Sequence, residues 1–209
     1  MLRENNYITA SCRISEHAIY KNNHKVFENK NISLNDFLLS AYDHFGLKYP
    51  KFYKMDNLSK LGWLCSELLL KDSFDHARHQ PEKVGIVLAN ANASLDTDLK
   101  YFESTKEFAS PSLFVYTLPN IVTGEICIRN KFKGENAFFI QDEFNAEFIQ
   151  QYVNNLLNSD ILQACICGWV DVLNENYEVF LLLVENGISK DAHAFTSGNI
   201  ELLNRKNKN

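Results

Sequence analysis

Thiols and imidazoles are the first side chains to consider for chemistry in this chain. Its five cysteines lie mostly within apolar runs, so we expect reduced core thiols and no disulfide framework. Cys165 and Cys167 form a C-x-C pair on a predicted strand, a pattern typical of two small residues on one strand face. His76 and His79 could share a helical face, but no third ligand is evident nearby. The sequence predicts no metal site.

An acidic pair, Asp142 and Glu143, is the second candidate for chemistry. It lies between a predicted strand and the clearest amphipathic helix in the chain, which is marked by Phe148, Ile149, Tyr152, Val153, Leu156 and Leu157. The simpler interpretation is that both acids occupy the first turn of that helix. There they would complement its dipole, contributing about 0.3–1 kcal/mol each when exposed.

Composition narrows the classes of function. The chain has 209 residues, 45% of them hydrophobic, and a net charge of -5 with no basic cluster, so a nucleic-acid partner is not expected. The eight glycines are scattered and form no phosphate-binding loop, so we expect no cofactor. The first ten residues contain no apolar signal segment, and no window is long enough to span a membrane. We therefore expect a cytoplasmic protein.

Apolar spacing and turn residues predict the elements that must position these side chains. We expect a helix capped by Ser33, another capped by Asp56 or Asn57, and two helical stretches between Leu95 and Phe132. Residues 21–31 read as a loop, and a turn at 174–176 predicts a hairpin. The predicted strands cover residues 7–14, 84–89, 136–140, 161–170 and 177–185.

The order of these elements, βααβααβαββ, predicts an α/β fold with layered helices on a mixed five-stranded sheet. We expect one domain over residues 1–203 and a disordered tail over 204–209.

Several strings resemble the N-terminal half of the β-ketoacyl synthases, which have the thiolase-like fold. The resemblance extends from the first predicted strand to Glu185. Within the family, the chain looks most like the short ketosynthase-like proteins encoded beside bacterial aryl-polyene and flexirubin-type pigment genes. Gly168, within one of the matching strings, would allow close backbone approach. The strings are FYKMD at 52–56, LSKL at 58–61, Ser110-Pro111, FVYTLPN at 114–120, Gly124, GEN at 134–136 and CGWVD at 167–171.

The resemblance implies a missing nucleophile. Ketosynthases carry a reactive cysteine on the turn into a helix, and that position falls at Glu143, with Gln141 and Asp142 before it and Phe144 after it. A carboxylate is a poor acyl carrier, because the mixed anhydride it would form is high in energy. The family's further catalytic residues come from the second half of the fold, which we expect this chain to lack. We therefore predict no catalytic residues and a non-catalytic, chain-length-factor-like subunit.

The same resemblance implies partners. In relatives the strand before this turn pairs across a dimer axis, and here it would comprise Asn136, Ala137, Phe138, Phe139 and Ile140. We expect a ketosynthase or a second copy of this chain as the partner, with an acyl carrier protein as a further candidate.

Three alternatives remain open for the turn and the pocket beside it. Glu143 could occupy a vestigial acyl site, much as glutamine replaces the cysteine in chain-length factors. It could also support decarboxylation or hydrolysis of an acyl thioester. Finally, Phe138, Phe139 and Phe144 could line a pocket for a small molecule.

Overall fold

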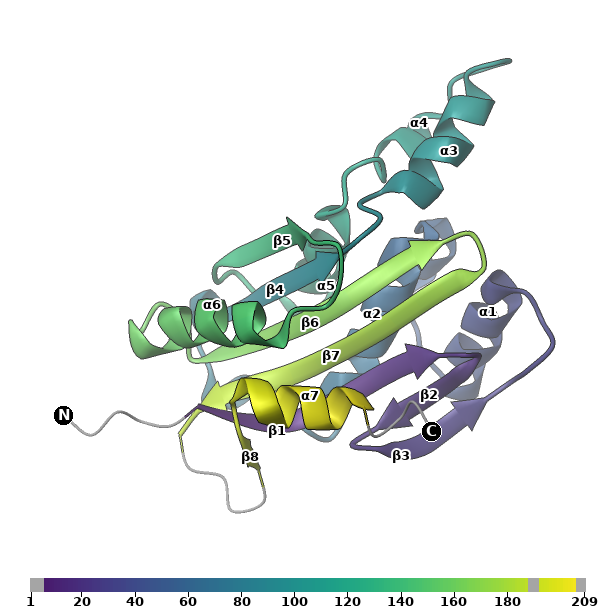
Figure 1. Ribbon diagram of the computed structural model, residues 1–209. Coiled ribbons are helices and arrows are strands. Elements are labelled where there is room, and N and C mark those ends of the chain that lie inside the picture. The colour runs from purple at the N-terminus through teal and green to yellow at the C-terminus, as the bar shows by residue number, and fades with distance from the viewer. Residues whose placement is uncertain (1–5, 188–191, 206–209) are drawn as a thin grey trace.

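The computed structural model describes residues 6–187 and 192–205, in which helices cover both faces of one mixed sheet (Figure 1). The strands are β1 (Asn6–Ser15), β2 (Ala18–Lys21), β3 (His24–Glu28), β4 (Val84–Asn90), β5 (Asn136–Ile140), β6 (Ala164–Leu173), β7 (Asn176–Asn186) and β8 (His193–Ala194). The helices are α1 (Leu34–His44), α2 (Asn57–Leu70), α3 (Leu95–Ser104), α4 (Pro111–Phe114), α5 (Ile121–Asn130), α6 (Ala146–Asn158) and α7 (Ser197–Arg205). Short 3-10 helices cover Pro50–Lys54, His76–Arg78 and Pro81–Lys83.

The sheet has the order β3-β2-β1-β7-β6-β4-β5, and β8 pairs with β1 beside this path. Strand β4 is parallel to β5 and β6, whereas β7 is antiparallel to β6 and β1. This arrangement confirms the predicted α/β class and the predicted hairpin of the last two long strands. The sheet has eight strands among the described residues, however, whereas five were predicted.

Of the three additional strands, β3 lies within the stretch expected as a loop over residues 21–31, and β2 ends at the first residue of that stretch. Strand β3 pairs with β2 through a tight turn at Asn22 and Asn23, whose φ angles are 49° and 65°. Two successive residues at positive φ form the turn that matches the twist of antiparallel strands, and asparagine tolerates this conformation. The polarity of β3, which led to the loop prediction, is that of an exposed edge strand.

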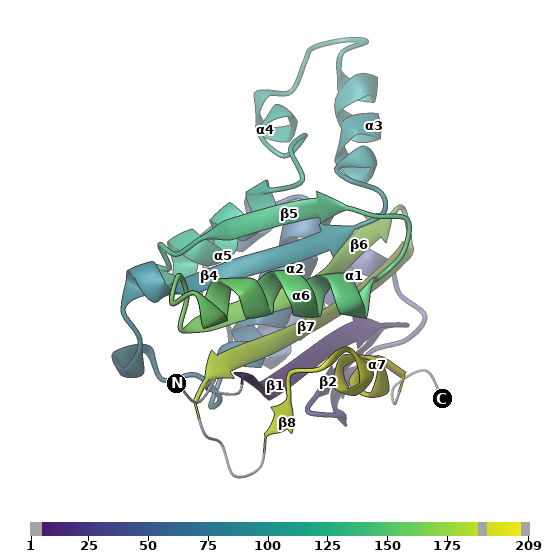
Figure 2. The same cartoon turned by 60° about the vertical axis from the view of Figure 1, so that its left-hand side comes forward.

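The two faces of the sheet bury separate apolar clusters. Helices α1, α2 and α5 cover one face around the fully buried Trp63 and Phe37, and α6 and α7 cover the other (Figures 1 and 2). Cys165 and Cys167 lie together in the second cluster, beneath α6, which confirms the predicted burial of this pair on one strand face.

Capping residues in the sequence predicted several helix boundaries correctly. Ser33 accepts a hydrogen bond from the backbone N–H of Asp36, and Asp56 accepts one from Ser59 at 2.9 Å. Three helices, and not two, lie between residues 95 and 132. The expected disordered tail is wrong at its start, because residues 204 and 205 complete α7, which packs its apolar face on the sheet. Residues 206–209 lie outside the described part of the chain.

Two features of the fold bear on the site. Gly168 has φ +145°, and a Cβ there would lie 2.0 Å from the carbonyl oxygen of Phe180, so the predicted close approach between β6 and β7 is confirmed. Helices α3 and α4 project from the body beyond the β5 side of the sheet (Figure 2). Within the described residues, no helix combines the length and apolar character needed to cross a bilayer.

Candidate functional site

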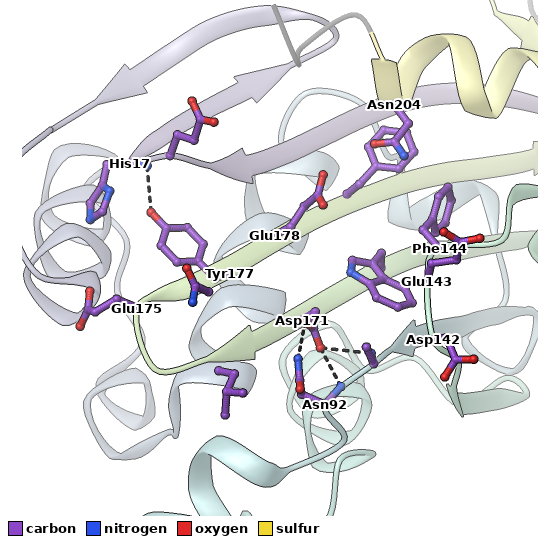
Figure 3. Close-up of a pocket in the computed structure, with 16 residues that line it drawn as sticks. His17, Asn92, Asp142, Glu143, Phe144, Asp171, Glu175, Tyr177, Glu178 and Asn204 are labelled. Atoms are coloured by element: carbon purple, nitrogen blue, oxygen red, sulfur yellow. Dashed lines mark hydrogen bonds between the residues drawn. The ribbon is translucent and has the colours of Figure 1, made fainter.

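A pocket of about 730 Å³ lies where β4, β5 and β6 end and the chain turns into loops (Figure 3). The turn after β5 forms one wall, the β6–β7 hairpin forms the floor, and the β1–β2 turn forms the far end. The residues that line it include Glu16, His17, Asn92, Asp142, Glu143, Phe144, Trp169, Asp171, Glu175, Tyr177, Glu178, Phe180 and Asn204.

The acidic pair lies in the turn and not in the helix. Helix α6 begins at Ala146, and its N-cap is Asn145, whose side chain accepts a hydrogen bond from the backbone N–H of Phe148 at 2.9 Å. The prediction that Asp142 and Glu143 occupy the first helical turn is therefore wrong, because the asparagine starts the helix after them. Both acidic side chains are exposed and line the pocket.

Phe144 is held in the pocket wall by two aromatic neighbours. Its ring meets Phe180 edge-on at 5.7 Å and Trp169 at 6.3 Å between centroids. Phe138 and Phe139 are not among the lining residues, contrary to the sequence-based suggestion. They alternate on β5, so Phe138 packs against the cluster under α2, whereas Phe139 packs against α6.

Asp171 fixes the loop after β4 to the floor of the pocket. Its carboxylate accepts hydrogen bonds from the backbone N–H groups of Ala91 and Asn92 at 3.1 and 3.0 Å, and from the Asn92 side chain at 2.7 Å. Asp171 was not among the predicted site residues. The available signal was an acidic side chain at the end of a long apolar strand, where burial demands hydrogen-bond partners.

The far end of the pocket is built around His17 and Tyr177. The backbone N–H of His17 donates to the Tyr177 hydroxyl at 2.9 Å, and burial raises the pKa of Tyr177 to about 12. The His17 ring packs edge-on against Phe37 and Tyr177, and its Nε2 is buried with no hydrogen-bond partner. Figure 3 shows His17 and Glu143 at opposite sides of the pocket.

The lining is strongly acidic. Among the residues that the structure describes, the lining contains six carboxylates and neither lysine nor arginine. Glu175 accepts a hydrogen bond from the backbone N–H of Leu34 at 2.8 Å, and Glu178 pairs with the buried guanidinium of Arg13. With Asp171, these two acids serve structural contacts. Glu16, Asp142 and Glu143 leave a negative surface that disfavours anionic ligands.

No thiol reaches this pocket. Burial raises the pKa of the Cys127 thiol to about 11 and holds the pKa values of Cys65 and Cys167 well above the usual range, so none of these forms thiolate readily. The cysteines are absent from the described lining. Among the residues placed by the structure, no group of three or more His, Cys, Asp or Glu side chains is arranged to hold a metal ion. His79 instead bonds to Glu185 at 2.9 Å.

Sequence comparison does not assign this chain. No protein-family model matches it, and no curated protein matches it by sequence.

Solved structures do resemble it in fold. The ishigamide ketosynthase/chain length factor superposes with a TM-score of 0.62 at 14% identity, over 90% of this chain and 64% of that one. A β-ketoacyl synthase from Burkholderia phymatum STM815 gives 0.59 at 10% identity, over 88% and 59%. A chain from the complex of a ketosynthase with its chain length factor from Xenorhabdus doucetiae gives 0.57 at 14% identity, over 95% and 90%.

The chain therefore has the thiolase-like fold of the ketosynthases and chain length factors, as the resemblance implied. It spans less than two thirds of the ishigamide and Burkholderia chains but nine tenths of the Xenorhabdus chain.

Proposed function

We propose that this chain is a non-catalytic, chain-length-factor-like subunit of a bacterial fatty acid or polyketide-type pathway, of the aryl-polyene kind, that pairs with a ketosynthase. One observation carries the proposal: a ketosynthase fold in which the turn after β5 reads Gln141, Asp142, Glu143, Phe144 and offers no thiol. Fold likeness gives the framework, and the chemistry of the turn argues against condensation.

The acidic pocket supports this assignment. Acyl groups reach a ketosynthase on a carrier whose phosphopantetheine arm bears a phosphate. Glu16, Asp142 and Glu143, with no lysine or arginine among the described lining residues, would repel that phosphate. Glu143 is exposed and makes no hydrogen bond to another described side chain that would orient it as a base. We therefore favour the subunit over a residual decarboxylase or hydrolase. An acyl carrier protein would be engaged mainly by the partner.

The extent of one fold match fits such a role. In the Xenorhabdus complex of a ketosynthase with its chain length factor, this chain matches nine tenths of one of the chains. That agreement supports a role for this fold as a member of a two-chain assembly. We place this subunit in the cytoplasm, where fatty acid-type synthesis supplies the partner.

Strand β5 is the proposed pairing surface. It is the last strand of the sheet and pairs only with β4 among the described strands. On the β4 side, the carbonyl of Glu135 accepts from Ile86 at 3.2 Å, and the N–H of Gln141 donates to Asn90 at 2.9 Å. Backbone groups alternate along a strand, so Asn136, Phe138 and Ile140 direct theirs away from β4. These free groups can accept a partner strand.

The test is co-expression with a complete ketosynthase encoded near this chain, followed by size-exclusion chromatography with light scattering. We expect the mass of a two-chain complex. A variant carrying Asn136→Pro and Ile140→Pro removes two outward N–H groups from exposed positions and leaves the bonds of residues 135 and 141 to β4 intact. This variant should elute without the ketosynthase.

The matched control carries Asn136→Thr and Ile140→Thr, which keep both N–H groups and favour a strand. It should retain the complex. If the wild-type chain elutes without the ketosynthase, the proposal is contradicted. If the proline variant still elutes as a complex with the ketosynthase, pairing through β5 is contradicted.

A small-molecule binder is the second candidate function, because a pocket of about 730 Å³ lies within the size range of ligand sites. Native mass spectrometry of the purified chain would favour it by finding a co-purified ligand mass that disappears on unfolding.

A further inference from the structure

Helix α7 is a short strap on the face of the sheet that α6 also covers (Figures 1 and 2). Of its nine residues, Ile200 and Leu203 are the buried ones. These two side chains join the apolar cluster under α6, which also contains Phe180 and Phe195. A helix this short is marginal by itself, so its position depends on what else holds it.

A buried arginine holds the end of α7. Arg13 lies in β1 with its side chain 4% exposed, and its guanidinium donates to the backbone carbonyl of Asn204 in the last turn of α7. The same guanidinium forms an ion pair with Glu178 of β7. The last carbonyls of a helix have no partner within the helix, and a cation there also complements the helix dipole. These contacts form a link between the sheet and α7, which we call the Arg13 bridge.

The Arg13 bridge borders the pocket. Glu178 and Asn204 both belong to the lining, and Figure 3 shows them across the pocket from Asn92. The Glu178 side chain is 35% exposed, whereas its partner Arg13 is almost fully buried. The bridge therefore reaches from the pocket surface into the interior beside α7.

An aromatic floor lies next to the bridge. Phe180 is 2% exposed and belongs to the same apolar cluster as Ile200 and Leu203 of α7. Trp169 is 6% exposed and lies opposite Phe180 on the paired strand β6. Both residues line the pocket, but a ligand can reach little of either ring at these exposures. Because α7 helps to bury this cluster, its displacement would uncover the floor.

We propose that α7 keeps the pocket closed over this aromatic floor, and that opening the Arg13 bridge admits an apolar ligand to it. The floor favours a ligand with an aromatic or aliphatic body. Glu16, Asp142 and Glu143 disfavour an anionic head group, so the ligand is neutral or cationic. The inference deepens the second candidate function and rests on it for the existence of a ligand. It does not depend on pairing with a ketosynthase.

Trp169 reports this movement directly. The chain has two tryptophans, and the other, Trp63, is fully buried under the opposite face of the sheet. Arg13→Met removes the guanidinium and keeps an apolar stem. Acrylamide quenching of tryptophan fluorescence in the isolated chain should then rise at least about threefold, because local opening of α7 gives the quencher access. The rise should vanish in a Trp169→Phe background, where Trp63 alone emits.

The matched control is Lys51→Met. It also takes the cation from a buried carboxylate, that of Glu125 at 2.8 Å, but this pair involves α5 on the opposite face of the sheet. Its quenching should equal that of the wild type. Leu203→Ala loosens α7 without touching the bridge and should reproduce the effect of Arg13→Met, so the test stands if the arginine variant does not fold.

Two further measurements on the isolated chain complete the test. Hydrogen exchange followed by mass spectrometry should be faster in α7 of both open variants and unchanged in α6. Nile red, a neutral apolar dye, should bind the open variants at least about tenfold more tightly than the wild type, because a rarely populated open state weakens apparent affinity.

The outcomes separate the proposals. Stronger quenching of Trp169, faster exchange confined to α7 and tighter Nile red binding support the inference. Faster exchange in α7 without a change at Trp169 overturns it, because α7 then frays without opening the pocket. Equal Nile red binding by the wild type and the open variants also overturns it. Each of these failures leaves the pairing with a ketosynthase standing. A purified chain without a co-purified ligand contradicts the second candidate function and not the opening of α7.

Discussion

The two edges of the sheet are built in opposite ways. At one edge, β3 carries Lys25 and Glu28, and Glu28 forms ion pairs at 3.1 Å with both Lys25 and Lys30. A register shift also interrupts its pairing with β2. At the other edge, β5 reads Asn-Ala-Phe-Phe-Ile and has no charged residue. Charges and irregularities keep an edge strand from adding further strands, whereas a plain apolar edge invites them.

This contrast indicates which edge of the sheet is available to pair with another chain. The charged side chains of β3 disfavour the addition of a further strand, so β3 needs no partner. Strand β5 pairs only with β4 among the described strands and carries the half-exposed Ile140, and helices α3 and α4 project on its side of the sheet. A single chain that protects one edge and leaves the other bare is consistent with a subunit that is covered on one side only.

Removing the protection of β3 should have the largest effect. We expect Lys25→Val with Glu28→Val to convert β3 into a second apolar edge and to raise light scattering of the purified chain by an order of magnitude at equal concentration. The control, Lys25→Gln with Glu28→Gln, removes the same charges but keeps polar side chains. If the valine variant scatters no more light than the wild type, the charges on β3 do not explain why the two edges differ.

Protecting β5 should give a smaller change in the opposite direction. We expect Ile140→Lys to lower the scattering of the isolated chain several-fold, because a lysine on an edge strand disfavours strand addition. Ile140 is 53% exposed, so the free energy of unfolding should change by less than about 0.5 kcal/mol in urea titrations. Ile140→Val is the matched control. Equal scattering from the lysine variant and the wild type would argue that the isolated chains do not associate through β5.

Sequence patterns predicted the parts of the fold that depend on burial. The strands at β4, β5, β6 and β7 and helix α6 follow from apolar runs and periodicity. The apolar pattern did not predict β3, because an exposed edge strand has the polar composition of a loop. The only sequence signal for β3 was the Asn22-Asn23 turn. It also failed at the acidic pair, because Asn145 is the N-cap of α6 and the helix therefore begins after Asp142 and Glu143.

The candidate site was less predictable than the fold. The resemblance located the turn at 141–144, and the structure places Asp142, Glu143 and Phe144 in the pocket lining. The rest of the lining comes from segments far apart in the chain, such as His17, Asp171 and Tyr177, and no local pattern brings these together. Their convergence depends on the pairing of β1 with β7 and of β6 with β7, which is a tertiary property.

The smallest expected effect concerns the ion pairs that protect β3. Hydrogen bonds from Lys30 and then from Lys25 hold the pKa of the Glu28 carboxyl below its usual value of about 4.3. The pairs therefore contribute above that value and lose their contribution as the pH falls through the lower pKa of the folded state. NMR titration should show a depressed Glu28 pKa that rises in Lys30→Gln and, by less, in Lys25→Gln, but not in Lys133→Gln beside β5. An ordinary Glu28 pKa would mean that β3 is protected by solvated charge alone, without fixed pairs.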